Sequence, residues 1–299
     1  MFQSHLGEIA SLAAALCWTI TAVAFESAGK RVGSISVNLI RLVIALLLIS
    51  VFNLFSRGMM LPLDASSSIW FWLFISGIIG FVIGDLFLFQ AFVLIGSRLS
   101  MLIMSTVPPI TAVTGFIMMG ERISLLGLTG MTITISGIAL VILTRNPAGK
   151  MVRFSYPVKG LIYAFIGALG QAFGLVFSKF GMESYNPFAA TQIRIIAAII
   201  GFALVITILK KWKNVYLALK DIKALKYISI GSLFGPFIGV SLALLAVQHS
   251  PTGIVSTITS ITPILIIPAA MIIFKEKVLP REIFGAIITL GGILLLFIN

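Results

Sequence analysis

The chain has 299 residues, of which 59% are hydrophobic and only 10% are charged, and its mean hydropathy is +1.15. A soluble domain carries roughly a quarter of its residues as charges, so this composition excludes a water-soluble protein and favours a surface that faces lipid. The net charge of +12 comes from basic residues between apolar stretches, which excludes a nucleic-acid-binding pattern, and the single cysteine, Cys17, excludes an internal disulfide or a cysteine metal site.

Ten apolar stretches are long enough to cross a bilayer, which takes about 20 residues. In chain order they lie at 7–25, 34–56, 68–94, 98–119, 124–144, 156–179, 187–209, 224–247, 252–274 and 281–298. The tail before the first stretch has no lysine or arginine, so we expect a retained helix there and no cleaved signal peptide. The connection KKWKNVYLALKDIKALK after the seventh stretch predicts a short helix at the membrane interface, where Trp212 and Tyr216 suit the headgroup layer.

The chain also contains an internal repeat. A shift of 153 residues places Arg41 on Arg194, and a shift of 155 residues places Gly80 on Gly235, Gly84 on Gly239, Pro108 on Pro263 and Glu121 on Glu276. Each copy has five stretches, an odd number, so the second copy must enter the membrane from the opposite side. The sequence therefore predicts an all-α integral membrane protein with ten transmembrane helices, built as two inverted five-helix repeats at 1–146 and 147–299.

The repeated residues are similar to those of a known family. Arg41 in NLIRLVIALLL, the run from Pro108 through GERISLLGLTGMTITISGIAL, and its copy from Pro263 through KEKVLPREIFGAIITLGGILL resemble the EamA-type repeats of the drug/metabolite transporter superfamily. The resemblance covers nearly the whole chain. It implies a multi-pass inner-membrane protein with a central cavity that exports or exchanges small metabolites, such as amino acids or amphipathic and cationic compounds, by alternating access. We expect a monomer without a cofactor whose partners are the substrate, the lipid bilayer and, if transport is coupled, protons.

The distribution of basic residues predicts the orientation. Loops after odd-numbered stretches carry sixteen of the 21 lysines and arginines, whereas loops after even-numbered stretches carry only Arg57, Arg122 and Lys179. The positive-inside rule then puts the odd loops in the cytoplasm and both termini outside. Many relatives in the superfamily have cytosolic termini, so this expectation differs from the analogy.

Three charged residues, Asp85, Arg41 and Arg194, lie well inside the apolar stretches, away from their ends. A charge such as Asp85 at this depth costs about 2.5–3.5 kcal/mol on insertion scales, so it should face a cavity or an arginine. Asp85 is either a proton-coupling carboxylate or an anchor for a cationic group, or it is a structural partner of Arg41 or Arg98. Arg41 and Arg194 occupy matched places in the repeats and are either structural, the favoured interpretation, or ligands for an anionic group.

Polar residues and prolines inside the stretches complete the candidate site. Trp18, Asn38, Gln90, Gln171 and Gln192 are candidates for substrate binding, and the alternative is hydrogen bonding between helices. Pro108 and Pro263 are candidate hinges, the alternative being static kinks. In the second copy Val240 replaces Asp85 and Leu245 replaces Gln90, so a polar role of those two residues is not shared.

Enzyme motifs are missing from the sequence. The chain has no P-loop, dinucleotide fingerprint, HExxH or nucleophile elbow, so we expect no catalytic or metal-binding residues and a protein that is not an enzyme. Two alternatives to a transporter remain open at this point. One is an intramembrane lipid-modifying enzyme, and the other is a membrane protein that binds a molecule without transporting it.

Overall fold

The computed structural model of the chain describes residues 5–119, 125–145, 152–154, 156–250, 255, 258–275 and 278–297. The first half contains α1 (Leu6–Val32), α2 (Ser34–Arg57), α3 (Ser67–Gly77), the π-helix η2 (Ile78–Gly84), α4 (Asp85–Met104), α5 (Val107–Met119) and α6 (Leu125–Ile142). The second half contains α7 (Val158–Met182), α8 (Pro187–Ile208), α9 (Trp212–Ala218), α10 (Ile222–Ser232), the π-helix η3 (Leu233–Gly239), α11 (Val240–His249), α13 (Thr262–Ile273) and α14 (Pro280–Phe297).

The described residues confirm the expected all-α fold class, with one short hairpin beside the helices. Strand β1 (Leu143–Arg145) pairs antiparallel with β2 (Val152–Phe154), with Thr144 opposite Arg153. The two strands include Thr144, Val152 and Phe154, residue types that favour strands. The boundary expected between residues 146 and 147 and the pair Glu121 and Glu276 lie outside the described residues.

The helices have the length and composition of membrane spans. Among the described residues, six continuous helical runs are long and apolar enough to cross a bilayer, and they lie at Leu6–Val32, Ser34–Arg57, Ser67–Met104, Val158–Met182, Pro187–Ile208 and Ile222–His249. Leu125–Val141 and Thr262–Ile273 are shorter apolar helices. The run to Met104 contains a break at Gly96, whose φ of 80° is not helical, so it holds the end of one expected stretch and the start of the next. The chain is a multi-pass membrane protein.

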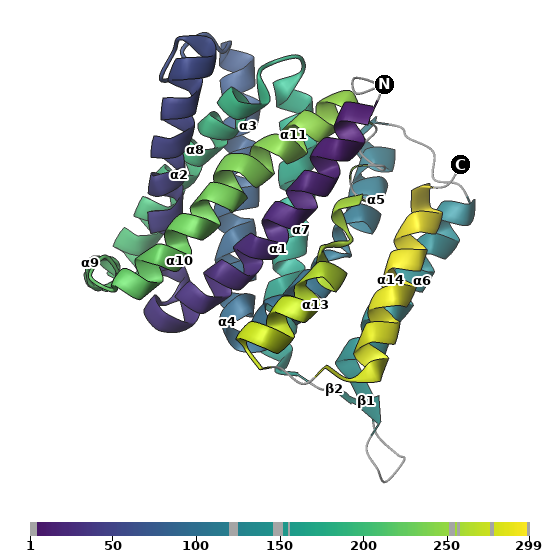
Figure 1. Cartoon of the computed structure of the whole chain (residues 1–299). Helices are drawn as coiled ribbons and strands as arrows, with labels where there is room; N and C mark the ends of the chain where they lie inside the picture. Colours follow the sequence, from purple (N-terminus) through teal and green to yellow (C-terminus); the bar gives the residue numbers. More distant parts are fainter. Residues whose placement is uncertain are drawn as a thin grey trace.

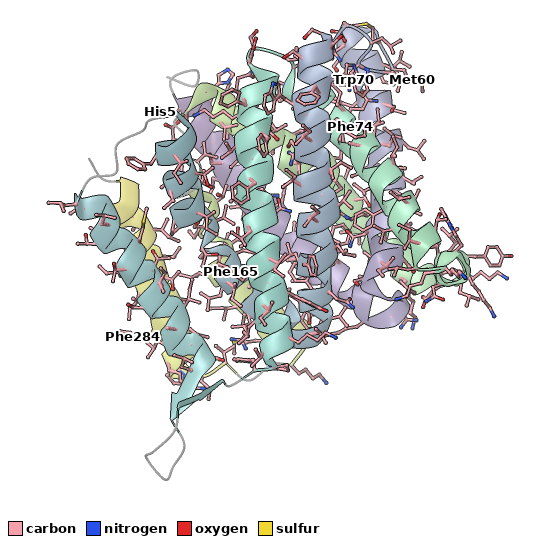
Figure 2. The ribbon with its side chains drawn as sticks, turned by 180° about the vertical axis from the view of Figure 1, so that it is seen from behind. His5, Met60, Trp70, Phe74, Phe165 and Phe284 are labelled. Atoms are coloured by element: carbon pink, nitrogen blue, oxygen red, sulfur yellow. The ribbon has the colours of Figure 1, made fainter. Side chains whose placement is uncertain are left out.

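Large apolar side chains cover the outside of the bundle. Phe165 and Phe284 lie on the outer surface (Figure 2) with 46% and 60% of their area exposed, and Phe55 is 85% exposed. A soluble protein does not leave so many large apolar groups in water. The exposed residues therefore mark the lipid-facing side, and the interior is left for the polar groups described below.

The two halves pack with the pattern of a two-fold axis. Helix α1 packs on α10 and α11, and its counterpart α7 packs on α3 and α4; α2 packs on its own counterpart α8, and α6 on its counterpart α14. Exchanging the halves maps each of these pairs onto another pair or onto itself, as in an isologous interface. Helix α1 begins at the end of the molecule where the N-terminus is marked, whereas α7 begins at the opposite end beside β2 (Figure 1). The two halves thus run in opposite directions.

Helix irregularities repeat in the two halves. The π-helices η2 and η3 each span seven residues and are separated by the 155-residue shift of the repeat. A turn at Ser105 separates α4 from α5 just before Pro108, and a turn at Ser260 precedes α13 just before Pro263. Proline has no backbone N–H to donate into the preceding turn, so a break at the matched place in each half is expected.

Helices α6 and α14 approach closely through glycines. A Cβ atom on Gly137 would lie 2.5 Å from Thr289 Oγ1, and one on Gly292 would lie 2.5 Å from the backbone nitrogen of Thr134. These separations are shorter than real Cβ contacts, so only glycine permits this packing. The α6–α14 pair is therefore a packing unit at one side of the bundle.

Candidate functional site

A cavity of about 180 Å³ lies between the two halves. Residues from α1, α2, η2, α4 and α5 of the first half line it, as do residues from α7, α8, η3, α11 and α13 of the second half. Of the residues singled out in the sequence, the cavity brings together Trp18, Arg41, Asp85, Pro108, Gln171, Arg194 and Pro263. The centre of the molecule thus has contributions from both repeats.

Asp85 is the hub of a polar cluster on one wall of this cavity. Its Oδ2 accepts a hydrogen bond from Arg41 Nη2, which forms an ion pair between two nearly buried side chains, and its Oδ1 accepts from Gln171 Nε2 at 2.6 Å. The Arg41 guanidinium also lies 4.6 Å from the ring centroid of Phe89. Of the two structural partners considered for Asp85, the geometry selects Arg41; Arg98 instead pairs with Glu282 at 3.1 Å.

The π-helix η2 and two close helix contacts place Asp85 beside Gln171. Asp85 is the first residue after η2, and its backbone N–H donates to Gly80 O across the wide π-turn. A Cβ on Gly170 would come within 2.5 Å of Gly84 Cα, and one on Gly174 within 2.8 Å of Gly80 Cα, so α7 lies directly against η2. Gln171, next to Gly170, reaches both Asp85 and the carbonyl of Gly80 for this reason.

Arg194 lies in the same cavity and forms no ion pair among the described residues; the Asp85 carboxylate, which is paired with Arg41, acts on it electrostatically from a greater distance. It is 4% exposed, its guanidinium carbon is 4.5 Å from the ring centroid of Phe81, and its Nε has no hydrogen-bond partner among the described residues. Gly80 leaves room for it, because a Cβ there would lie 3.1 Å from Arg194 Nη2. The formal charge of this wall is +1, the sum of the charges of Arg41, Asp85 and Arg194.

The positions equivalent to Asp85 and Gln171 carry an apolar and an aromatic side chain. Trp18 is the repeat mate of Gln171, and Val240 is the repeat mate of Asp85. Trp18 approaches Gly239 as Gln171 approaches Gly84: a Cβ on Gly239 would lie 3.2 Å from Trp18 Nε1, and a Cβ on Gly84 would lie 3.3 Å from Gln171 Nε2. The same backbone arrangement therefore presents an amide and a carboxylate on one side and an indole and a valine on the other.

The other three predicted binding residues do not line the cavity. Asn38 Oδ1 accepts from Arg41 Nε at 3.0 Å, and its Nδ2 donates to Asp85 O at 3.3 Å. Gln192 joins α8 to α2 by donating to Ser50 Oγ at 2.8 Å, and Gln90 accepts from Ser34 Oγ. The geometry thus gives these amides the alternative role of hydrogen bonding between helices, and Asn38 additionally orients the arginine of the ion pair.

The buried carboxylate of Glu26 was not identified from the sequence. Helix α1 continues to Val32, past the expected end at residue 25, and so includes Glu26, which is 0% exposed. Its Oε1 pairs with Lys30, and its Oε2 accepts from the backbone N–H of Ser97 at 2.6 Å, directly after the break at Gly96. The spacing of Glu26 and Lys30, four residues apart on one helix face, was the available signal.

A second polar cluster lies at the end of α2, where the α2–α3 connection with Asp64 meets the α7–α8 connection with Tyr185. Tyr185 O–H donates to Asp64 Oδ1 at 2.8 Å, and Arg57 pairs with the other oxygen of Asp64. Burial first, and then the hydrogen bond to Asp64, raises the pKa of Tyr185 to about 12. This cluster closes the end of the molecule where Met60 and Trp70 lie (Figure 2) and is separate from the cavity.

Comparisons with known proteins agree with the fold. The model of the EamA-like transporter family matches residues 5–143 and 158–298. No curated protein sequence matches the chain. Solved structures do match, in 28 chains; one of them, described as "Crystal structure of protein", is 16% identical, covers 97% of this chain and 95% of its own, and superposes with a TM-score of 0.65. At that identity the likeness shows the fold alone.

Proposed function

Since the chain belongs to the EamA-like transporter family, we propose that it is a secondary carrier that moves a small organic metabolite across the membrane by alternating access. The observation that carries this proposal is the cavity itself. It is lined by both inverted halves, it holds buried polar groups, and it lies at the helix breaks before Pro108 and Pro263. Binding sites at the interface of inverted repeats, beside discontinuous helices, are typical of such carriers.

The proposed mechanism uses the similarity and the opposite directions of the two halves. Two similar halves of opposite direction can exchange conformations, and the exchange would open the cavity first to one side and then to the other. The turns at Ser105 and Ser260 would act as hinges, because the backbone there is already released from regular helix bonding. Closing the cavity on one side while it opens on the other prevents a continuous leak.

The proposal includes the membrane arrangement. We propose ten spanning helices in the inner membrane, a monomer, and both termini outside. Two features of the end opposite the N-terminus support the orientation: α9 and β1–β2 lie there (Figure 1), and most of the basic loop residues belong to it. Export as the direction follows from the family resemblance, and Asp85 is the candidate for coupling to protons.

Transport by purified protein in liposomes is the test. Protein reconstituted into proteoliposomes should release or accumulate labelled small metabolites faster than empty liposomes. Ala243→Trp, which fills the cavity, should abolish the flux, whereas Phe165→Trp on the lipid-facing surface should leave it unchanged. Equal flux in both variants would contradict a route through this cavity.

The same preparation separates the rival functions. A binding protein that does not transport would show ligand-induced stabilisation without flux. A lipid-modifying enzyme would alter the masses of the liposome lipids on incubation. A carrier moves solute and leaves the lipid composition unchanged.

A further inference from the structure

The charges in the cavity are unequal in number. Both oxygens of Asp85 are occupied, one by Arg41 and the other by Gln171. Arg194, which lies in the same cavity, forms no ion pair within the described part of the chain, and its Nε has no hydrogen-bond partner there; the one carboxylate that acts on it electrostatically, Asp85, is already paired with Arg41. A buried charge without a partner costs several kcal/mol, so its retention in the interior needs a reason.

The repeat shows which position differs between the two arginines. Arg41 and Arg194 are repeat mates, so the position that should neutralise Arg194 is the mate of Asp85. That position is Val240, which lines the same cavity and has no charge. The second half therefore keeps the arginine of the buried pair and replaces its carboxylate by an apolar side chain.

We propose that the carried molecule supplies the missing carboxylate: it is a small organic monoanion whose carboxylate binds Arg194 and whose apolar body packs against Trp18 and Val240. This inference rests on the proposed carrier function. Thr21 Oγ1 and Ser105 Oγ also line the cavity without a hydrogen-bond partner among the described residues, and they offer further donors to the bound anion. Guanidinium groups bind carboxylates with paired, charge-assisted hydrogen bonds.

The charge and the lining select this class over others. A monoanion neutralises the single excess positive charge, whereas a dianion such as phosphate would reverse it and a cation would add to it. Most of the lining is apolar, including Phe25, Phe81 and Leu244, and a chloride ion would leave that surface without a contact. The volume of about 180 Å³ lies below the roughly 300–1,000 Å³ of drug-sized sites, which limits the molecule to a small one.

Thermal unfolding of the purified full chain tests the binding step. In chloride-free buffer, the protein is titrated with acetate, benzoate and 3-phenylpropionate, with the matched neutral 3-phenylpropionamide and cationic 3-phenylpropylammonium, and with sodium chloride. A ligand that binds the folded state raises the melting temperature with concentration. We expect at least one carboxylate with an apolar body to raise it, and the amide and the ammonium compound to bind at least tenfold more weakly.

Variants of Arg194 and its mate distinguish recognition from structural support. Arg194→Gln should abolish the carboxylate shift and leave the ligand-free melting temperature equal or higher, because it removes an unpaired buried charge. Arg41→Gln, the matched control, should lower the ligand-free melting temperature, because it strands Asp85. Val240→Asp restores the pair that the first half retains, and should abolish the carboxylate shift while keeping Arg194.

Several results would overturn the inference. They are the absence of a shift with every carboxylate, an equal shift with the amide, a shift by chloride alone, and a ligand-free destabilisation by Arg194→Gln as large as that by Arg41→Gln. Flux measurements separate this inference from the carrier proposal. Transport that is insensitive to Arg194→Gln would contradict the anion site and keep the carrier, whereas Arg194-dependent carboxylate binding without flux would contradict the carrier and keep the site.

Discussion

Replacing Asp85 by asparagine preserves the shape of the side chain and removes its charge. Arg41, which is 3% exposed, then loses its ion-pair partner, and the cavity wall carries two uncompensated arginines. Removing one partner of a buried pair typically costs about 3–5 kcal/mol, because the other charge stays buried. At about 2–4 °C per kcal/mol for a chain of this size class, Asp85→Asn should lower the melting temperature by on the order of 10 °C.

The double variant makes this prediction specific. Asp85→Asn combined with Arg41→Gln removes both charges of the pair, so the double variant should have a higher melting temperature than either single variant. Its loss of stability should be clearly smaller than the sum of the two single losses. The assay is thermal unfolding of detergent-purified protein, followed by counterflow and pH-driven flux in proteoliposomes. If Asp85 couples protons, the surviving Asp85→Asn protein should retain counterflow and lose pH-driven accumulation. An Asp85→Asn protein with wild-type melting temperature, binding and pH dependence would refute both the structural role of Asp85 as the ion-pair partner of Arg41 and its role in proton coupling.

Three further predictions address the rest of the molecule. Gly292→Ala should lower the melting temperature and loosen the α6–α14 contact, whereas Gly291→Ala, where a Cβ would meet nothing within 4 Å, should not; equal melting of the two variants would contradict the close packing. The pKa of Tyr185 is raised to about 12 from the usual 10, so the stability that the protonated side chain contributes is complete below pH 10 and is lost as the pH rises through 12. An absorbance titration of the protein, compared with Tyr185→Phe, should show this ionisation. Asp64→Asn removes the acceptor of the tyrosine hydrogen bond and should lower the pKa of Tyr185. A cysteine introduced beside Lys211 should resist an impermeant reagent in intact cells, and labelling there, with protection at the C-terminus, would reverse the orientation.

Sequence reasoning reached the repeat because its markers are rare residues with fixed roles. Gly80 and Pro108 each have a mate 155 residues later, and Arg41 has one 153 residues later. In the structure Gly80 lies in a π-helix, Pro108 follows a helix break, and Arg41 belongs to a buried ion pair. Hydrophobicity alone could not do this in a chain that is 59% hydrophobic. The glycines of α6 and α14 are likewise residues with a fixed role, because Gly137 and Gly292 lie at close contacts between the two helices.

The roles of individual polar residues could not be read from the sequence. Gln171 and Gln192 are both amides inside apolar stretches, yet only Gln171 lines the cavity. The difference depends on which helix each one faces, and that depends on long-range packing. The spacing of Asp85 and Gln90 alone indicates different directions, because five residues are 1.4 helical turns. The structure agrees: Asp85 lines the cavity and Gln90 does not. Both residues belong to α4, which begins directly after the π-helix η2, so the α-helical spacing applies between them.

The matched π-helices also bear on the origin of the chain. A π-helix holds one more residue per turn than an α-helix, so it records a single-residue insertion, and such segments make up well under 1% of protein residues. Two independent insertions that start at Ile78 and at Leu233, at the shift of the repeat, would be a rare coincidence. We infer that the insertion is older than the duplication.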